Sequence, residues 1–263
     1  MAILACPVCG NPLTRSENTY LCGNRHSFDI SKQGYVNLIL PNKKNSPISG
    51  DNRQSVRARE SFLSNGYYKP LADRLNLLAG ELPRVENVLD LGCGVGYYAG
   101  ELKKHLPGAE LFGLDVSKEA VRLAAARHKD ISFIVGNAFR LPFADGSFDL
   151  IINIFAPADP DELKRTLAAG GAVFAVRPGE NHLAELRKLL YDAPRSHEDK
   201  LDLPGLSLTA KERVSCQITV PPEDLQALYK MTPYFWNAPP PDTAAAEITV
   251  DFIIYVHTNI TIV

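Results

Sequence analysis

Short apolar runs and amphipathic segments alternate along the middle of this chain. The pattern predicts strands at residues 86–91, 110–114, 131–135, 148–154 and 172–177, and helices at residues 97–106, 118–128 and 161–168. Because strands that alternate with helices form parallel sheets, we expect an α/β fold with helices on both faces of a mostly parallel sheet. Two later stretches rich in Val, Ile and Thr, residues 206–220 and 247–257, are expected to close the sheet as antiparallel strands.

The region before this sheet predicts a linker and two helices. Residues 40–53 are rich in Pro, Asn, Ser, Gly and Lys, a composition typical of a mobile linker. Residues 54–65 favour a helix that stops at Asn65-Gly66. Apolar residues recur every three or four positions from Leu71 to Leu78, which predicts an amphipathic helix that packs on the main domain.

Four side chains with the spacing C-x2-C-x12-C-x3-H precede the linker: Cys6, Cys9, Cys22 and His26. Three thiolates and one imidazole would fill a zinc tetrahedron, which predicts a structural site. The metal would supply most of the folding free energy of so short a segment, on the order of 10 kcal/mol. The alternative is a reduced, metal-free cysteine pair or a disulfide. We expect the remaining Cys93 and Cys216 to be reduced thiols.

Composition fits one large domain with a small appendage, since 45% of the 263 residues are hydrophobic. We see no leader segment and no apolar run of the roughly 20 residues that cross a bilayer, so we expect a cytoplasmic protein without a membrane partner. The net charge is −2, but residues 1–80 hold ten Lys or Arg against five Asp or Glu. This basic part predicts contacts with RNA phosphates, and an ordinary solvated surface is the alternative.

A glycine loop follows the first strand of the predicted sheet and reads D-x-G-x-G-x-G, formed by Asp90, Gly92, Gly94 and Gly96. A dinucleotide fingerprint would need a third glycine where Tyr97 stands. The loop instead suits a ligand with an amino-acid part and a nucleoside part, and Asp90 would hold its ammonium group directly or through water.

Two further positions support a nucleoside ligand. Asp115 ends the second strand, nineteen residues past Gly96, where a carboxylate can accept both ribose hydroxyls. Asn137-Ala138 follows the third strand. These positions and the loop predict binding of S-adenosylmethionine. The alternative is a glycine-rich turn in an unrelated α/β fold.

The chain resembles the bacterial 23S ribosomal RNA guanine-N1 methyltransferases over nearly its whole length. The shared segments are CPVCGNPL, HSFDISKQGYVNLI, NGYYKPL, VLDLGCGVGYY, FGLDVSK, RLPFADGSFD, PGENHL and MTPYFW. The resemblance implies a class I Rossmann-like methyltransferase domain behind a zinc ribbon, with a 23S ribosomal RNA hairpin as substrate. It implies that the four N-terminal ligands bind zinc and that the methyl-donor pocket is lined by Tyr68, Gly94, Val95, Gly96, Tyr97 and His182.

Three parts follow from this resemblance. We expect a zinc-binding ribbon at residues 1–38, a linker and connecting helix at 39–70, and the S-adenosylmethionine-dependent methyltransferase domain at 71–263. The chain departs from the family pattern at residues 153–157, where a basic residue and a Tyr are expected, and at 167–171, which lack a Lys-Pro pair.

Catalysis would align donor and acceptor and help N1 lose its proton. Candidate groups are Asp159, Glu180 and His182, for which the alternatives are a helix cap, a solvated carboxylate and a donor contact. Aromatic candidates for stacking on an unstacked base are Phe155, Tyr234, Phe235 and Trp236, the last three equally suited to core packing.

Two other functions remain open at this point: a class I methyltransferase acting on a small molecule, and a non-catalytic RNA-binding protein. An elongated RNA could be shared by two zinc modules, which favours a homodimer.

Overall fold

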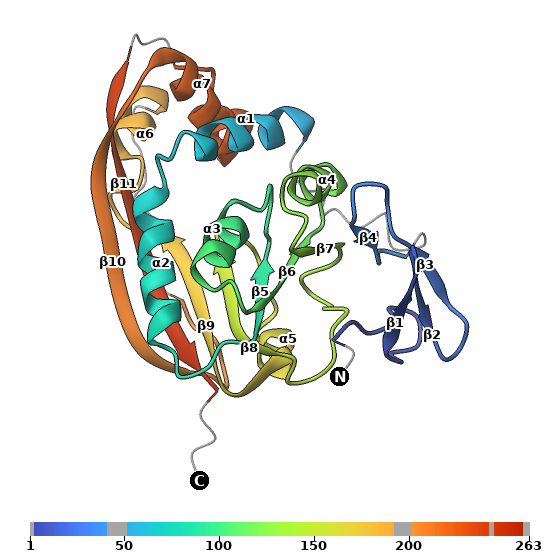
Figure 1. Ribbon diagram of the computed structural model, residues 1–263. Helices are drawn as coiled ribbons and strands as arrows, with labels where there is room; N and C mark the ends of the chain where they lie inside the picture. Colours follow the sequence, from blue (N-terminus) through green and yellow to red (C-terminus); the bar gives the residue numbers. More distant parts are fainter. Residues whose placement is uncertain (1–2, 41–51, 192–200, 242–244, 260–263) are drawn as a thin grey trace.

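The computed structural model describes residues 3–40, 52–191, 201–241 and 245–259 (Figure 1). Within these ranges the main sheet has the strand order β10-β11-β9-β8-β5-β6-β7-β4. Its strands are β4 (Val36–Asn37), β5 (Asn87–Leu91), β6 (Glu110–Asp115), β7 (Ser132–Val135), β8 (Phe148–Ile154), β9 (Leu167–Pro178), β10 (Ser207–Val220) and β11 (Ala246–Thr258). The pairs from β4 to β9 are parallel, and β10 and β11 add antiparallel strands beside β9. The predicted mostly parallel α/β fold is confirmed.

The helices are α1 (Arg53–Ser64), α2 (Lys69–Glu81), α3 (Tyr97–His105), α4 (Lys118–Arg127), α5 (Pro160–Thr166), α6 (Ala184–Leu190) and α7 (Pro222–Met231), followed by the 3-10 turn η2 (Pro233–Trp236). The pattern predicted α1 to α5 but missed α6, α7 and η2. Most of the predicted linker, residues 41–51, lies outside the described residues.

Alternation along each strand divides the core into two faces. On β5, Val88 packs with the large cluster under α1, α2, α3 and α4, whereas Leu89 and Leu91 face the opposite side. That second face is covered by α5 and by residues of the N-terminal segment, including Leu4 and Leu13. Because side chains alternate with a period of two, Asp90 points to the same face as Val88, toward α3.

The glycine pair at residues 170 and 171 lies inside β9, which begins earlier than the predicted strand at residues 172–177. The helix ends at Thr166, and β9 begins directly at Leu167, which pairs with Phe148. A register shift between Phe148 and Leu150 absorbs the extra residues as a bulge, and Gly170 takes φ +75°. The connection from α5 to β9 is therefore shorter than the sequence predicted, because the strand follows the helix directly.

The N-terminal segment forms a small antiparallel sheet of β1 (Leu13–Ser16), β2 (Thr19–Cys22) and β3 (Ser27–Asp29). It leads into β4, which pairs in parallel with β7 through Val36 and Ile134. An isolated bridge also joins Leu4 to Phe143. Two backbone connections therefore fix this sheet against the main domain, at the edge of the sheet seen on the right in Figure 1.

Candidate functional site

The zinc ligands predicted from spacing converge in the N-terminal sheet. Cys22 ends β2, and His26 follows in the turn before β3. Nδ1 of His26 lies 3.5 Å from Sγ of Cys6 and 3.4 Å from Sγ of Cys22, and Sγ of Cys9 lies 3.8 Å from Sγ of Cys22. All four ligand atoms fall within 4.8 Å of one another. A tetrahedron with zinc–sulfur bonds of about 2.3 Å has edges near 3.8 Å, so the cluster fits zinc.

The glycine loop turns sharply between β5 and α3. Gly92, Gly94 and Gly96 all have positive φ, at +80°, +52° and +76°. A Cβ on Gly92 would lie 2.2 Å from Cβ of Ala156, so the loop also needs glycine for close packing. Only glycine adopts three such conformations in five residues without strain.

A cavity of about 810 Å³ opens above this loop, at the carboxyl ends of the parallel strands. The predicted donor-site residues that line it are Tyr68, Gly92, Gly94, Val95, Tyr97, Asp115, Asn137, Ala138 and His182. Asp90 and Gly96 are buried behind the loop and are absent from the cavity wall. Ligand sites in open α/β sheets lie at this edge of the sheet, so the position fits a nucleoside ligand.

Asp115 connects the loop to the end of β6. Its Oδ2 accepts the N–H of Gly94 at 2.9 Å, and its Oδ1 accepts the N–H of Ser117 at 2.7 Å. These bonds hold the carboxylate at the cavity wall, where its remaining lone pairs can accept ribose hydroxyls.

Three buried polar atoms around the cavity have no hydrogen-bond partner within the described part of the chain: Oγ of Ser55, Oδ2 of Asp90 and the hydroxyl of Tyr98. Buried polar groups are rarely left unpaired, so a polar ligand or its bound water is expected to complete them. Burial raises the pKa of Asp90 to about 7, opposed by the backbone N–H of Ala99 and reinforced by the charge of Asp115. A cationic ligand would favour the ionised form. The site therefore fits a donor that carries an ammonium group.

His182 is buried in the wall of the cavity. Its Nδ1 accepts the backbone N–H of Asp251 at 3.2 Å, and its Nε2 lies 3.5 Å from the hydroxyl of Tyr68. Because a backbone N–H only donates, the neutral ring carries its proton on Nε2. This tautomer presents a donor to the cavity.

The other two catalytic candidates lie outside the cavity. Asp159 is the N-cap of α5, where Oδ1 accepts the N–H groups of Asp161 at 2.9 Å and Glu162 at 3.3 Å. Glu180 is exposed. These surroundings match the two alternatives given above, a helix cap for Asp159 and a solvated carboxylate for Glu180.

Phe155, Tyr234 and Trp236 line the cavity, whereas Phe235 does not. Phe155 is 42% exposed and Trp236 is 64% exposed, so both rings present free faces. Phe155 also has φ +55°, a conformation that is costly for a bulky residue and clusters at functional sites. Its ring centroid lies 5.5 Å from that of His182.

Sequence reasoning missed two arginines of the cavity, Arg59 on α1 and Arg177 at the end of β9. Arg59 Nη2 donates to the carbonyl of Met231 at 2.9 Å. Arg177 Nη1 donates to Oδ1 of Asn153 at 3.1 Å. Neither belongs to a motif, because only the tertiary fold brings them to the loop.

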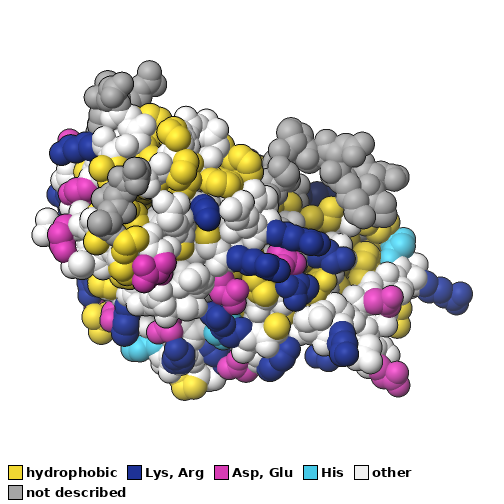
Figure 2. All heavy atoms as spheres, turned by 90° about the horizontal axis from the view of Figure 1, so that it is seen from above, with side chains coloured by type: hydrophobic (Ala, Val, Ile, Leu, Met, Phe, Trp, Pro, Cys, Tyr) yellow, Lys and Arg dark blue, Asp and Glu magenta, His cyan; other side chains and the backbone are white. Residues whose placement is uncertain are grey.

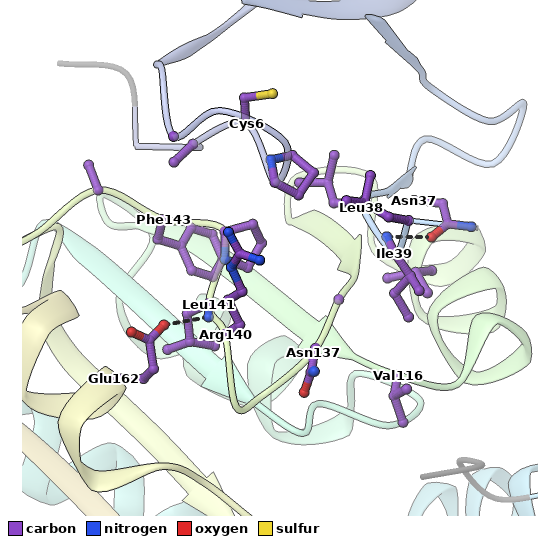
Figure 3. A pocket seen from close by; sticks show the side chains of 18 of the residues that line it. Cys6, Asn37, Leu38, Ile39, Val116, Asn137, Arg140, Leu141, Phe143 and Glu162 are labelled. Atoms are coloured by element: carbon purple, nitrogen blue, oxygen red, sulfur yellow. Dashed lines mark hydrogen bonds between the residues drawn. The ribbon is translucent and has the colours of Figure 1, made fainter. Parts of the chain in front are cut away.

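A second cavity of about 640 Å³ separates the N-terminal sheet from the main domain. Figure 3 shows Cys6, Leu38 and Asn37 on one side and Arg140, Leu141 and Phe143 on the other. Asn137 lines both cavities, so the N-terminal sheet stands directly beside the donor site.

This fold and this site define a class I S-adenosylmethionine-dependent methyltransferase that carries a structural zinc ribbon. In the described part of the chain, the helices are too short or too polar to cross a bilayer.

Comparisons with known proteins narrow the class. Residues 88–176 match the family model "Methyltransferase domain", and residues 4–47 match the zinc-ribbon model "RlmA, N-terminal". The chain is 34% identical over 253 residues to the 23S rRNA (guanine(748)-N(1))-methyltransferase of Streptomyces fradiae, covering 92% of this chain and 88% of the relative. It is 29% identical to the "Putative 23S rRNA (guanine-N(1)-)-methyltransferase YxjB" of Bacillus subtilis (strain 168), covering 97% and 96%.

A crystal structure of a "putative methyltransferase" from Bacillus halodurans C-125 aligns with a TM-score of 0.50 at 18% identity, over 72% of this chain and 98% of that one, and supports the fold alone. The chain belongs to the RlmA-type family of 23S rRNA (guanine-N1)-methyltransferases, as the sequence resemblance predicted.

Proposed function

We propose that this protein transfers a methyl group from S-adenosylmethionine to N1 of a guanine in a hairpin of 23S ribosomal RNA. The observation that carries the proposal is the attachment of the zinc ribbon through β4 to β7, because Asn137, two residues past the end of β7, lines the donor cavity. Family membership over 92% of the chain supports the same substrate. A ribbon fixed beside the donor site suits a substrate larger than a nucleotide.

When bound, S-adenosylmethionine supplies a sulfonium methyl group. Asp115 would hold the ribose hydroxyls, and Asp90 would hold the ammonium group through water, since it lies behind the loop. Arg59 brings a cation to the same side, near Gly94, where it would meet the carboxylate of the donor. Most of the rate enhancement would come from alignment of donor and acceptor.

The target guanine would have to leave its stack to enter the cavity. Phe155 and Trp236 offer exposed rings at the cavity wall, and a base stacked on an aromatic ring gains about 1–3 kcal/mol. In this tautomer His182 acts as a hydrogen-bond donor that orients a ligand, and not as a general base.

Basic side chains lie between the main domain and the ribbon, and Figure 2 shows Lys and Arg gathered on this face. Arg53 and Arg57 on α1 are exposed and act electrostatically on Glu119 of α4. Lys118 and Arg140 line the cavity between ribbon and main domain. Phosphates of a hairpin would contact this surface while its loop reaches the donor site.

The proposal includes the expected division into ribbon (1–38), connecting segment (39–70) and methyltransferase domain (71–263), a cytoplasmic location, and a homodimer that shares one RNA. The dimer rests on the length of an RNA hairpin, and sedimentation of the protein with and without RNA tests it.

The decisive experiment is transfer of labelled methyl from S-adenosylmethionine to unmodified 23S rRNA, with the product mapped by primer-extension arrest. An arrest at one guanine is expected, because N1 methylation blocks base pairing. Label in a small molecule but none in RNA would establish the small-molecule alternative. Donor binding without transfer to either would establish the non-catalytic one.

A further inference from the structure

The wall of the donor cavity contains a partly buried cation, Arg177, without a carboxylate partner among the described residues. Arg177 Nη1 donates to Oδ1 of Asn153 and to the carbonyl of Val176, both neutral acceptors, at 3.1 Å and 2.8 Å. Burial lowers the pKa of Arg177 from its ordinary value, opposed by the charge of Tyr255. Arginine nevertheless stays protonated, so this cation is partly withdrawn from water without an anionic partner in the described part of the chain.

Two other partly buried arginines of the chain, Arg74 and Arg165, have anionic partners. Arg74 binds Glu212 at 2.5 and 2.7 Å, and Arg165 binds both Glu162 and Asp145 at 2.8 Å. On β11, beside Arg177, the buried carboxylate of Asp251 is taken by Arg213 at 2.7 and 2.9 Å. Because the acceptors of Arg177 among the described residues are neutral, its charge is available to an anionic atom of a ligand.

The position of Arg177 is set from two sides. Arg177 sits near the carboxyl end of β9, and its cavity neighbours Phe155 and His182 include the exposed ring that would stack on the base. Asn153 is buried on β8, where its Nδ2 donates to the carbonyl of Leu91 at 3.2 Å while its Oδ1 accepts from Arg177. Asn153 is therefore a positioning residue, and the rest of the guanidinium fork keeps donors for a ligand.

Among the described residues, the titratable side chains that line this cavity include no well-placed base. Asp115 is bound to the donor loop, and His182 carries its proton on the nitrogen that faces the cavity. Tyr68 is neutral, because burial raises the pKa of its hydroxyl. The remaining charged group is Arg59 on the donor side. Loss of the guanine N1 proton must then be favoured by stabilising the anion that results.

We propose that Arg177 is a catalytic residue that binds O6 of the target guanine and stabilises the negative charge that develops there as N1 loses its proton. This rests on the proposed function. The N1 proton passes to water, and the negative charge delocalises onto O6. The electron pair on N1 then forms the N1–CH3 bond while the S–CH3 bond breaks. The electron pair of the broken S–CH3 bond stays on sulfur. A preformed cation in a water-poor site is well suited to this.

The test compares wild type, Arg177→Met and Arg177→Lys on hairpin RNAs that carry guanine or 6-thioguanine at the target. Arg177→Met is expected to lower kcat about 100-fold, as for removal of one anion-stabilising donor. It should also move the rise of kcat to higher pH and leave donor affinity within about twofold, in line with a role confined to the acceptor. Arg177→Lys, a point charge without the fork, should fall between the two. The more acidic N1 of 6-thioguanine should restore Arg177→Met at least tenfold relative to wild type.

Arg84→Met is the matched control, since Arg84 is exposed and pairs with Glu86 far from the cavity. Equal effects of 6-thioguanine on wild type and Arg177→Met, or an unchanged pH profile in Arg177→Met, would overturn the proposal. Failure of wild type to methylate guanine N1 would instead remove the proposed function, and the Arg177 proposal with it.

Discussion

The backbone N–H of Asp251 donates to Nδ1 of His182 across 3.2 Å, and this one bond fixes the tautomer of a histidine in the methyl-donor cavity. The carboxylate of Asp251 also accepts the N–H of Asn181 at 3.0 Å, so it holds the turn that carries the ring. Gly179 completes the turn, because a Cβ there would lie 2.4 Å from Oδ2 of Asp251. The ring of His182 is thus oriented to donate a hydrogen bond from Nε2.

If His182 acts as a hydrogen-bond donor, its substitution should have only a mild effect on kcat. His182→Gln retains a side-chain N–H and should lower kcat less than tenfold, with the larger change in the KM for S-adenosylmethionine. A general base would instead account for a factor of 10² to 10⁴. Steady-state kinetics across pH check this, with His105→Gln, at the exposed end of α3, as control. A 100-fold loss of kcat with a changed pH profile would contradict the assignment.

Asp90 predicts a pH dependence of donor binding. Its pKa in the free protein is raised to about 7, so below pH 7 the carboxyl is largely protonated and cannot attract an ammonium group. Affinity for S-adenosylhomocysteine should therefore rise with pH up to about tenfold per unit between pH 5.5 and 7, and binding should release a proton. Calorimetry in two buffers of different ionisation enthalpy measures both.

The isosteric Asp90→Asn variant is the control for this linkage and should bind with little pH dependence. It should also alter stability, because a raised carboxyl pKa makes the folded state lose stability as pH rises from about 4 to about 7. The variant should lack that fall in urea unfolding. Equal pH profiles for wild type and variant would mean that Asp90 does not interact with the ligand.

Asp115 predicts a loss of donor affinity. Asp115→Ala removes the acceptor for ribose and releases the N–H groups of Gly94 and Ser117. We expect binding weaker by roughly 1.5–3 kcal/mol, the range for a hydrogen bond to a charged group. Calorimetry with S-adenosylhomocysteine measures this, and Asp130→Ala, an exposed carboxylate beyond the cavity, should change nothing. An unchanged dissociation constant in Asp115→Ala would place the ribose elsewhere.

How much could be predicted from sequence depended on how local each signal was. The strand at residues 148–154 was predicted to the residue, because a buried parallel strand is a largely apolar run, here interrupted at Asp149 and Asn153. The Cys motif of the zinc site and the Gly motif of the loop could be recognised in the sequence, because their geometry is set within a few residues. The places of Arg177 and Arg59 in the cavity wall were missed, since the cavity joins α1, β8 and β9 only after folding. The short strand β4 was missed because two residues carry no period, and its pairing with β7 is a tertiary contact.

Zinc removal should affect the ribbon before the donor site. Cys9→Ser deletes one ligand of the cluster and should release zinc and abolish RNA binding. S-adenosylhomocysteine binding should persist, because the donor cavity is formed without β1, β2 or β3. Zinc content, RNA retention and calorimetry are measured together. Cys216→Ser on β10, outside the cluster, is the control, and intact RNA affinity in Cys9→Ser would remove the ribbon from RNA binding.

The exposed arginines of α1 predict a salt-dependent affinity for the RNA hairpin. Each phosphate contact contributes about one unit to the slope of log affinity against log salt concentration, somewhat less for unpaired segments. Arg57→Ala should therefore weaken binding and lower the slope by about one, because Arg57 is exposed beside α4, next to the ribbon cavity. Arg84→Ala removes an equal charge from the opposite end of β5 and should leave the slope unchanged. Filter binding between about 50 and 200 mM salt resolves the difference. If both variants lowered the slope equally, attraction would come from overall charge, and the RNA path along α1 and α4 would be wrong.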